Sequence, residues 1–165
     1  TPISANETAN SLHDRLADLG ADAILEYLRE HKNLGAEKQD NTQACYAKKL
    51  SKQEAQINWH EDANQIARNV RAFNPVPVAF FKLEDMRIRV FEGSPIKNDS
   101  SEPAGTIINK DKQGILIKCG KGAYLIETLQ LPGSKAMPVH AFINGGKNLL
   151  NPGDILESPA QEANL

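Results

Sequence analysis

The chain has 165 residues, 40% of them hydrophobic, and a formal net charge of −2. This composition suits one medium-sized domain or a smaller domain with an appended segment. There is no apolar run of about 18 residues that would cross a membrane, and the polar start has neither the basic nor the apolar part of a signal peptide. Cys45 and Cys119 lack metal-ligand spacing and are expected to be free thiols of a cytoplasmic protein.

The first predicted element is a helix over residues 7–31. Its apolar residues recur at three- and four-residue spacing and form one stripe, made by Leu12, Leu16, Leu19, Ala23 and Tyr27. Asn6 is the expected N-cap, with Glu7 in the first turn. The chain offers no obvious partner for this apolar stripe.

A linker and a second helix follow. Residues 32–47 have no periodicity and several turn formers, which indicates a linker. The spacing of Ile66, Val70 and Phe73 predicts a helix over 61–72, and two prolines at positions 75 and 77 stop it.

After position 77 the hydrophobic period changes to two. Residues 78–83 and 87–92 flank a short turn and are predicted to form a hairpin. Further strands are expected at 105–109, 114–119 and 123–131, with a short helix at 138–144. Several short strands joined by turns are typical of a small barrel.

Positive charge is concentrated in the middle of the chain. Residues 45–97 carry nine basic and six acidic side chains, whereas residues 1–44 carry four basic and eight acidic. This asymmetry favours a polyanionic partner, and the few aromatic residues favour an RNA backbone over stacked bases. The candidate contacts are Lys48, Lys49, Lys52, Arg68, Arg71, Arg87, Arg89, Lys118 and Lys121.

No catalytic constellation is visible in the sequence. The four histidines are scattered, without a carboxylate or cysteine at the spacing of a triad or a metal site. The glycines near positions 120 and 133 lack the spacing of a phosphate-binding loop and are interpreted as strand turns. We therefore predict no catalytic residue and no metal site.

Two motifs give the chain a family resemblance: KLSKQEAQINW at 49–59 and RAFNPVP at 71–77. They resemble the start of the C-terminal domain of the methionyl-tRNA formyltransferase family, where KLSKEEA, I-[DN]-W and RAFNPWP are typical. The resemblance extends over nearly the whole chain, because 2–28 is similar to the last helical segment of the family's catalytic domain. Residues 133–146 and 152–156 are similar to its closing helix and last strand. Val76 and His60 depart from the tryptophan and serine that are common in the family.

The resemblance implies a mainly β fold with flanking helices: an OB-like β-barrel preceded by an α-helical remnant of an α/β catalytic domain. The implied parts are a terminal helical segment of the catalytic domain (1–31), a basic linker (32–52) and an OB-like C-terminal domain (53–165). Lys49 and Lys52 match the family's KLSK, and Arg71 matches the arginine of RAFNP. These matches imply that Lys49, Lys52 and Arg71 bind tRNA, with a structural role as the alternative for Arg71. The other candidate contacts rest on charge and periodicity alone.

The resemblance also implies the parent activity. Such enzymes transfer a formyl group from 10-formyltetrahydrofolate to methionine on initiator tRNA, using an asparagine, a histidine and an aspartate upstream of the region matched here. We therefore expect this chain to be part of a longer protein, to hold no cofactor and to be inactive alone. The expected partners are initiator methionyl-tRNA and the N-terminal catalytic domain, with no membrane and with the chain as a monomer.

Three alternatives stay open. The first is a formyltransferase that acts on a nucleotide sugar or a hydrolase that acts on formyltetrahydrofolate; these enzymes share the barrel, but the KLSK connector favours the tRNA enzyme. A second alternative is a barrel that only supports the catalytic domain and binds no RNA. A third is a free-standing OB module for single strands, which the sparse aromatic residues disfavour.

Overall fold

The computed structural model describes residues 1–146 and 148–159. The chain divides into two compact units, Thr1–Leu50 and Ser51–Leu165. Each unit is considered by itself.

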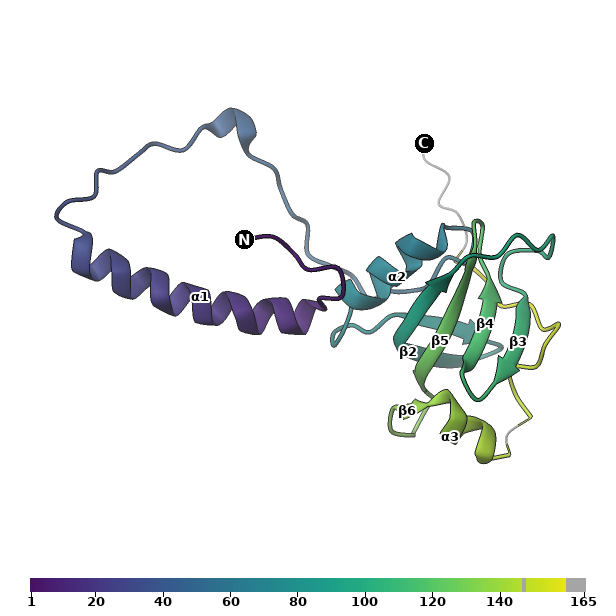
Figure 1. Cartoon of the computed structure of the whole chain (residues 1–165). Helices are drawn as coiled ribbons and strands as arrows, with labels where there is room; N and C mark the ends of the chain where they lie inside the picture. Colours follow the sequence, from purple (N-terminus) through teal and green to yellow (C-terminus); the bar gives the residue numbers. More distant parts are fainter. Residues whose placement is uncertain (147, 160–165) are drawn as a thin grey trace. The chain divides into compact units, whose positions relative to one another are not determined.

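The first unit is built around one long helix, α1 (Ala9–Glu30) (Figure 1). Its N-cap is Thr8 and not the predicted Asn6, because Thr8 and Ser11 form a reciprocal pair of side chain to backbone hydrogen bonds of 3.2 and 3.0 Å. Glu7 therefore lies outside the helix. Its carboxylate accepts two hydrogen bonds from the Arg15 guanidinium, at 2.8 and 2.9 Å, which hold the segment before the helix on its first turns.

None of the residues of α1 is buried within the structure described. Leu16, Leu19 and Tyr27, which belong to the predicted apolar stripe, are 46%, 44% and 52% exposed. The segment that follows is exposed and mostly extended, apart from one 3₁₀ turn, η1 (Asn41–Gln43), which Asp40 caps.

The second unit begins with a capped helix, α2 (Ala63–Ala72). Asp62 accepts a hydrogen bond from the Asn64 amide at 2.8 Å, and this satisfies one of the free N–H groups at the helix start. The buried face of α2 contains Ile66, Ala67 and Val70, and it packs against strands β2 (Met86–Ile96) and β5 (Ala123–Gln130). The prediction of a helix at 61–72 is therefore confirmed, with a start two residues later.

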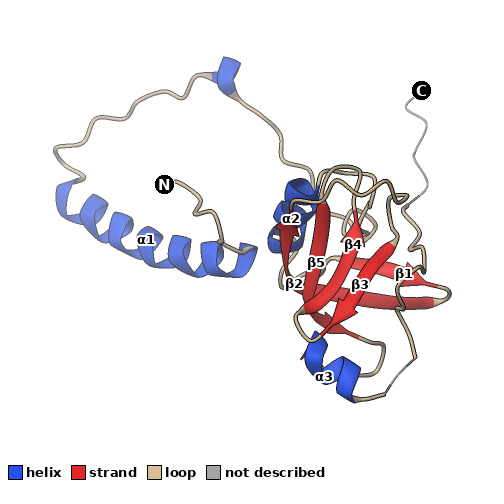
Figure 2. Ribbon diagram, turned by 45° about the vertical axis from the view of Figure 1, so that its right-hand side comes forward, coloured by secondary structure: helices blue, strands red, loops and turns tan. Residues whose placement is uncertain are grey.

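The strands of the second unit form one antiparallel sheet in the order β1-β2-β5-β4-β3. The strands are β1 (Phe80–Leu83), β2 (Met86–Ile96), β3 (Ile107–Asp111), β4 (Gly114–Lys118), β5 (Ala123–Gln130) and β6 (Met137–Pro138), of which β6 pairs with β5. The sheet is strongly curled (Figure 2). Helix α3 (Val139–Asn144) lies at the opposite end of the sheet from α2 (Figures 1 and 2).

A segment near the end of the described chain joins the two outer strands. Ile107 of β3 donates to the Asp154 carbonyl at 2.8 Å, and Leu156 donates to the Gly105 carbonyl at 2.9 Å. Farther along the same segment, Glu157 forms an antiparallel β-bridge with Lys82 of β1. The final segment thus pairs with both edges of the curled sheet, as the predicted last strand would.

Alternating residues of the strands fill the interior of this sheet. The largest fully buried side chains of the unit include Trp59, Phe81, Tyr124 and Phe142. Trp59 meets Phe81 edge to face at 5.8 Å between ring centroids, which fixes the segment before α2 on the core. The prediction of a mainly β fold with flanking helices is confirmed.

Candidate nucleic-acid interface

The clearest group of basic side chains lies on the outer face of β1 and β2. In β2, Ile88 and Val90 are fully buried, so Arg87 and Arg89 point to the opposite face. The register places Arg87 directly opposite Lys82 of β1, and Arg89 opposite Gln130 of β5. Because directly opposed residues share one face of a sheet, the three cations form a row. We call Lys82, Arg87 and Arg89 the basic row.

Arg87 is held by an aromatic ring. Its guanidinium carbon lies 3.6 Å from the centroid of the Phe80 ring, which is itself buried. The Nε atom of Arg87 is buried and has no hydrogen-bond partner among the described residues. Burial, with a smaller effect of the neighbouring Arg89 charge, lowers the pKa of Arg87 from its usual range. The positive charge of Arg87 is therefore fixed in place and incompletely solvated.

Arg89 is held by a side chain of the neighbouring strand. It donates a hydrogen bond of 3.0 Å to the Gln130 amide oxygen, while the Gln130 amide nitrogen donates to the Ser134 carbonyl at 2.7 Å. The two arginines and Gln130 line a cleft of about 210 Å³, whose other wall is the turn 131–133. The basic row therefore ends in a concave site with two guanidinium groups in its wall.

The predicted basic residues of α2 are placed less favourably. Arg68 is exposed, and its guanidinium donates to the Gln65 side chain of the same helix at 3.1 and 2.6 Å. Arg71 is half-buried in the last turn, near Tyr124. Burial raises the pKa of the Tyr124 phenol, and the positive charge of Arg71 acts against that rise. Both arginines are thus engaged with their own unit, and only Arg68 stands well out in solvent.

Two predicted lysines flank the turn between β4 and β5. Lys121 is exposed and pairs with Asp62 at 3.6 Å, beside a cleft of about 520 Å³ that also contains Asp99. Lys118 is only 9% exposed, and its ammonium lies 3.5 Å from the Gly122 carbonyl oxygen. Lys118 therefore offers little surface to a partner, and the charge of Lys121 is already partly compensated.

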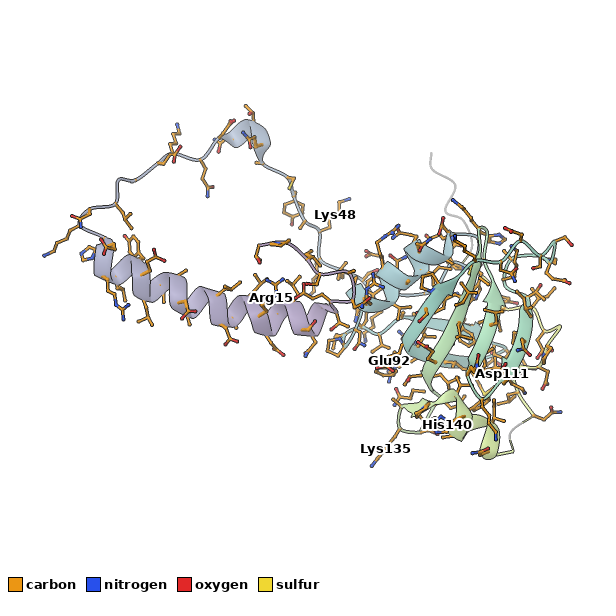
Figure 3. All side chains as sticks on the ribbon, in the orientation of Figure 1. Arg15, Lys48, Glu92, Asp111, Lys135 and His140 are labelled. Carbon is orange, nitrogen blue, oxygen red and sulfur yellow. The ribbon has the colours of Figure 1, made fainter. Side chains whose placement is uncertain are left out.

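The predicted connector lysines are exposed. Lys48 and Lys49 belong to the first unit, and Lys48 projects from its extended segment (Figure 3). Lys52 opens the second unit, where Glu54 accepts a hydrogen bond from the Ser51 amide at 2.8 Å. Each of the three lysines is accessible in its own unit.

The structure adds Lys82 to the residues predicted from the sequence. Its side chain is exposed, and it lies opposite Arg87 in the β1–β2 hairpin. The signal was present in the sequence, because a short turn between 83 and 86 fixes the pairing of a period-two hairpin. The charge count alone did not single it out.

Two kinds of reactive group can be assessed in the described part of the chain, metal-ligand clusters and cysteine thiols. Among residues 1–146 and 148–159, no group of three His, Cys, Asp or Glu side chains is placed to hold a metal ion. Cys119 is buried, and burial raises the pKa of its thiol to about 12, so the reactive thiolate does not form at neutral pH. None of the described helices is long and apolar enough to span a bilayer.

Solved structures with a similar fold include two variants of HypX from Aquifex aeolicus. One has a TM-score of 0.64 at 15% identity, and the match covers 96% of this chain and 31% of that protein. The other has a TM-score of 0.61 at 16% identity and covers 96% and 30%. At such low identity the likeness concerns the fold alone.

Sequence comparison identifies closer relatives. They include proteins named methionyl-tRNA formyltransferase from Marinobacter nauticus, 44% identical over 158 residues, and from Hahella chejuensis, 42% identical over 159 residues. These matches cover 94% and 95% of this chain but 51% and 50% of the relatives, so the chain spans about half the length of the curated relatives it matches. Residues 49–147 match the family described as formyl transferase, C-terminal domain. The chain therefore belongs to the formyl transferase C-terminal domain family.

Proposed function

We propose that this chain is the tRNA-binding C-terminal part of a cytoplasmic methionyl-tRNA formyltransferase. The observation that carries the proposal is the 44% and 42% identity, over almost the whole chain, to two relatives of that name. The KLSK and RAFNP motifs support the same enzyme over the sugar formyltransferase and the formyltetrahydrofolate hydrolase. In this reading the whole enzyme transfers formyl from 10-formyltetrahydrofolate to the methionine of initiator tRNA.

The role assigned to this chain is to hold the tRNA by its backbone. Two groups of its cations are assigned to this role: the exposed connector lysines 48, 49 and 52, and the basic row of the sheet, in which Arg87 is half-buried. Cations that contact phosphates contribute affinity and orientation without reading bases. Discrimination of the initiator tRNA then belongs to the remainder of the enzyme, and the chain alone has no formyltransferase activity.

The proposal also assigns a part of the enzyme to each segment of the chain. Residues 1–31 are assigned to the end of the catalytic domain, 32–52 to the basic linker and 53–165 to the C-terminal domain. The exposed apolar stripe of α1 supports the first assignment, because isolated helices of this kind gain most of their stability from packing on a partner. The same stripe also favours the rival in which the chain only supports the catalytic domain.

A binding experiment at different salt concentrations distinguishes the tRNA-binding role from the purely supporting role. Labelled initiator tRNA is titrated with the wild-type chain at two salt concentrations. With about three to five phosphates contacted, the slope of log K against log salt is expected to be roughly −2 to −4.5. A matched pair of double variants is compared: Lys49→Ala with Lys52→Ala, and Arg29→Ala with Lys112→Ala, which removes the same charge at exposed positions outside the linker. Weaker binding by the first variant only supports the proposal. No binding, or no dependence on salt, favours the supporting role.

A further inference from the structure

Arg87 and Arg89 carry positive charge that no described acidic group balances. The ion pairs among the described residues join His13 to Asp14, Arg15 to Glu7 and Lys121 to Asp62, and none involves β2. The two arginines instead lie near each other, and the Arg89 charge disfavours the charged form of Arg87. A half-buried cation beside a like charge is costly, and an anion in the cleft would remove that cost. The larger cleft near Lys121 differs, because Asp62 and Asp99 already lie in its wall.

Both guanidinium groups are positioned before any ligand arrives. The Phe80 ring lies under Arg87, and the backbone of Phe80 is fixed on both sides by hydrogen bonds of 2.9 and 2.7 Å with Ala55 and Ile57. Gln130 fixes Arg89, and the bond from Gln130 to the Ser134 carbonyl leaves its amide oxygen directed at Arg89. Positioned donors bind more tightly than flexible ones because less side-chain freedom is lost on binding.

The wall opposite the arginines leaves room for a ligand. Gly133 lies in that wall at φ +71°, and a Cβ built on it would meet no atom within 4 Å. The basic side chains of the cleft, Arg87 and Arg89, lie in one wall, and the turn 131–133 in the other wall contributes no charged side chain. A tetrahedral anion matches the chemistry of this wall, since two guanidinium groups offer several N–H donors to one phosphate.

We propose that the cleft between Arg87, Arg89 and the turn 131–133 binds one phosphate of an RNA backbone. The inference rests on the proposed function for the identity of the ligand, and on the geometry of the cleft for its location. Phe80 and Gln130 act as positioning residues, because they hold the guanidinium groups of the two arginines in place. Lys82, opposite Arg87, extends the basic row toward the neighbouring part of the same strand of RNA.

The first test uses inorganic phosphate and the full chain. The Nε–Hε signals of Arg87 and Arg89 are followed by NMR during titration with phosphate and, separately, with acetate at the same ionic strength. A saturable shift with phosphate, absent with acetate and absent in Arg89→Gln, supports the site. Equal shifts with both anions, or none, overturn it. In Phe80→Leu the ring-current shift of the Arg87 signal should disappear and phosphate binding should weaken, whereas a purely structural role predicts unchanged phosphate binding in the folded variant.

The second test uses initiator tRNA. Arg87→Gln and Arg89→Gln should each weaken binding roughly three- to tenfold at low salt and make the salt slope shallower by about 1. Arg87→Lys should recover only part of the loss, because lysine lacks the planar fork. Lys112→Gln, which removes one exposed charge at the β3–β4 turn, is the matched control and should bind as the wild type does.

The two proposals fail in different ways. If the Lys49 and Lys52 double variant binds tRNA less well while Arg87→Gln and Arg89→Gln bind normally, the phosphate cleft is refuted and the proposed function stands. If the wild-type chain does not bind tRNA, the proposed function of this chain is refuted together with the RNA ligand of the cleft. A phosphate shift in that case would identify only a site for free anions.

Discussion

Gly120 is predicted to be the least replaceable glycine of the β4–β5 turn, although its sequence context reads as an ordinary strand turn. Its amide donates to two carbonyl groups of the segment before α2, Trp59 at 2.9 Å and Glu61 at 3.0 Å. A Cβ at this position would overlap the His60 carbonyl oxygen and lie 2.7 Å from the His60 carbonyl carbon. Both obstacles are backbone atoms, so no side-chain rotation relieves them. Gly120→Ala must therefore separate the turn from the segment 59–61.

The cost can be estimated from its parts. Overpacking a close-packed site costs about 1–3 kcal/mol, and loss of the shared amide hydrogen bond costs about 1 kcal/mol. The lower entropy of the unfolded alanine chain offsets roughly 0.4–1 kcal/mol of this. The net expectation is a loss of about 1–3.5 kcal/mol in the free energy of unfolding of the second unit. For a unit of this size the melting temperature should fall by roughly 4–14 °C.

Trp59 provides a direct readout of this prediction. It is the single tryptophan of the chain, it is fully buried, and it lies in the segment that Gly120 contacts. Urea unfolding followed by its fluorescence should give a lower midpoint with an unchanged slope. Gly133→Ala is the control, because the added methyl group meets only open space and the cost is limited to its left-handed backbone, about 1 kcal/mol. A midpoint for Gly120→Ala equal to that of the wild type, or of Gly133→Ala, would refute the reasoning.

Three further predictions follow from the structure. Leu156, which is 2% exposed in the segment that pairs with both sheet edges, should cost about 2–5 kcal/mol when replaced by Ala, whereas the neighbouring, 60% exposed Ile155→Ala should be nearly neutral in urea unfolding. The hydrogen bond from Arg15 lowers the pKa of Glu7 to about 2, so the stabilisation by this pair is complete above the ordinary value of about 4.5 and is lost as the pH falls toward 2. NMR titration of the segment before α1 should show this loss as a change of chemical shift with pH. In Glu7→Gln the same signals should no longer depend on pH in this range. The amide hydrogens of α1 should exchange with solvent much faster than those of β3–β5. Equal protection of the two regions would contradict the division of the chain into two independent units.

The elements with a clear hydrophobic period could be predicted from the sequence. Their observed ends differ from the predicted ends because of local hydrogen bonding and pairing. The first helix was expected at 7–31 and runs from Ala9 to Glu30, because Thr8 and Ser11 form a better cap than Asn6. Strand β2 was expected to end at Glu92 but continues to Ile96. The pairing register shifts around Phe91, which breaks the alternation without ending the strand. A bulge of this kind hides the second half of a strand from any period-two pattern.

The long-range closure of the sheet was harder to predict. The residues that pair with both edges, 153–157, have no alternation of their own, and only the family resemblance suggested a strand there. The contact of Gly120 with the Trp59 and Glu61 carbonyls was equally hidden, because a glycine signals a special backbone position without naming what approaches it. Such contacts depend on the whole fold and leave no local signature.

Which basic side chains are accessible to a partner was also only partly predictable from the sequence. Period two correctly placed Arg87 and Arg89 on one face, yet an equally simple reading assigned an accessible role to Lys118, which the structure buries against the Gly122 carbonyl. Alternation states which side of a strand a residue faces, but it does not state whether another segment covers that side. Of two consecutive phenylalanines in β1, only one can point inward, and the outer one, Phe80, becomes the support for Arg87. A basic side chain can bind a phosphate in a fixed position only where its aliphatic part is supported and its N–H donors stay uncovered. For Arg87 and Arg89 both conditions depend on the packing of β1, β2 and the turn after β5.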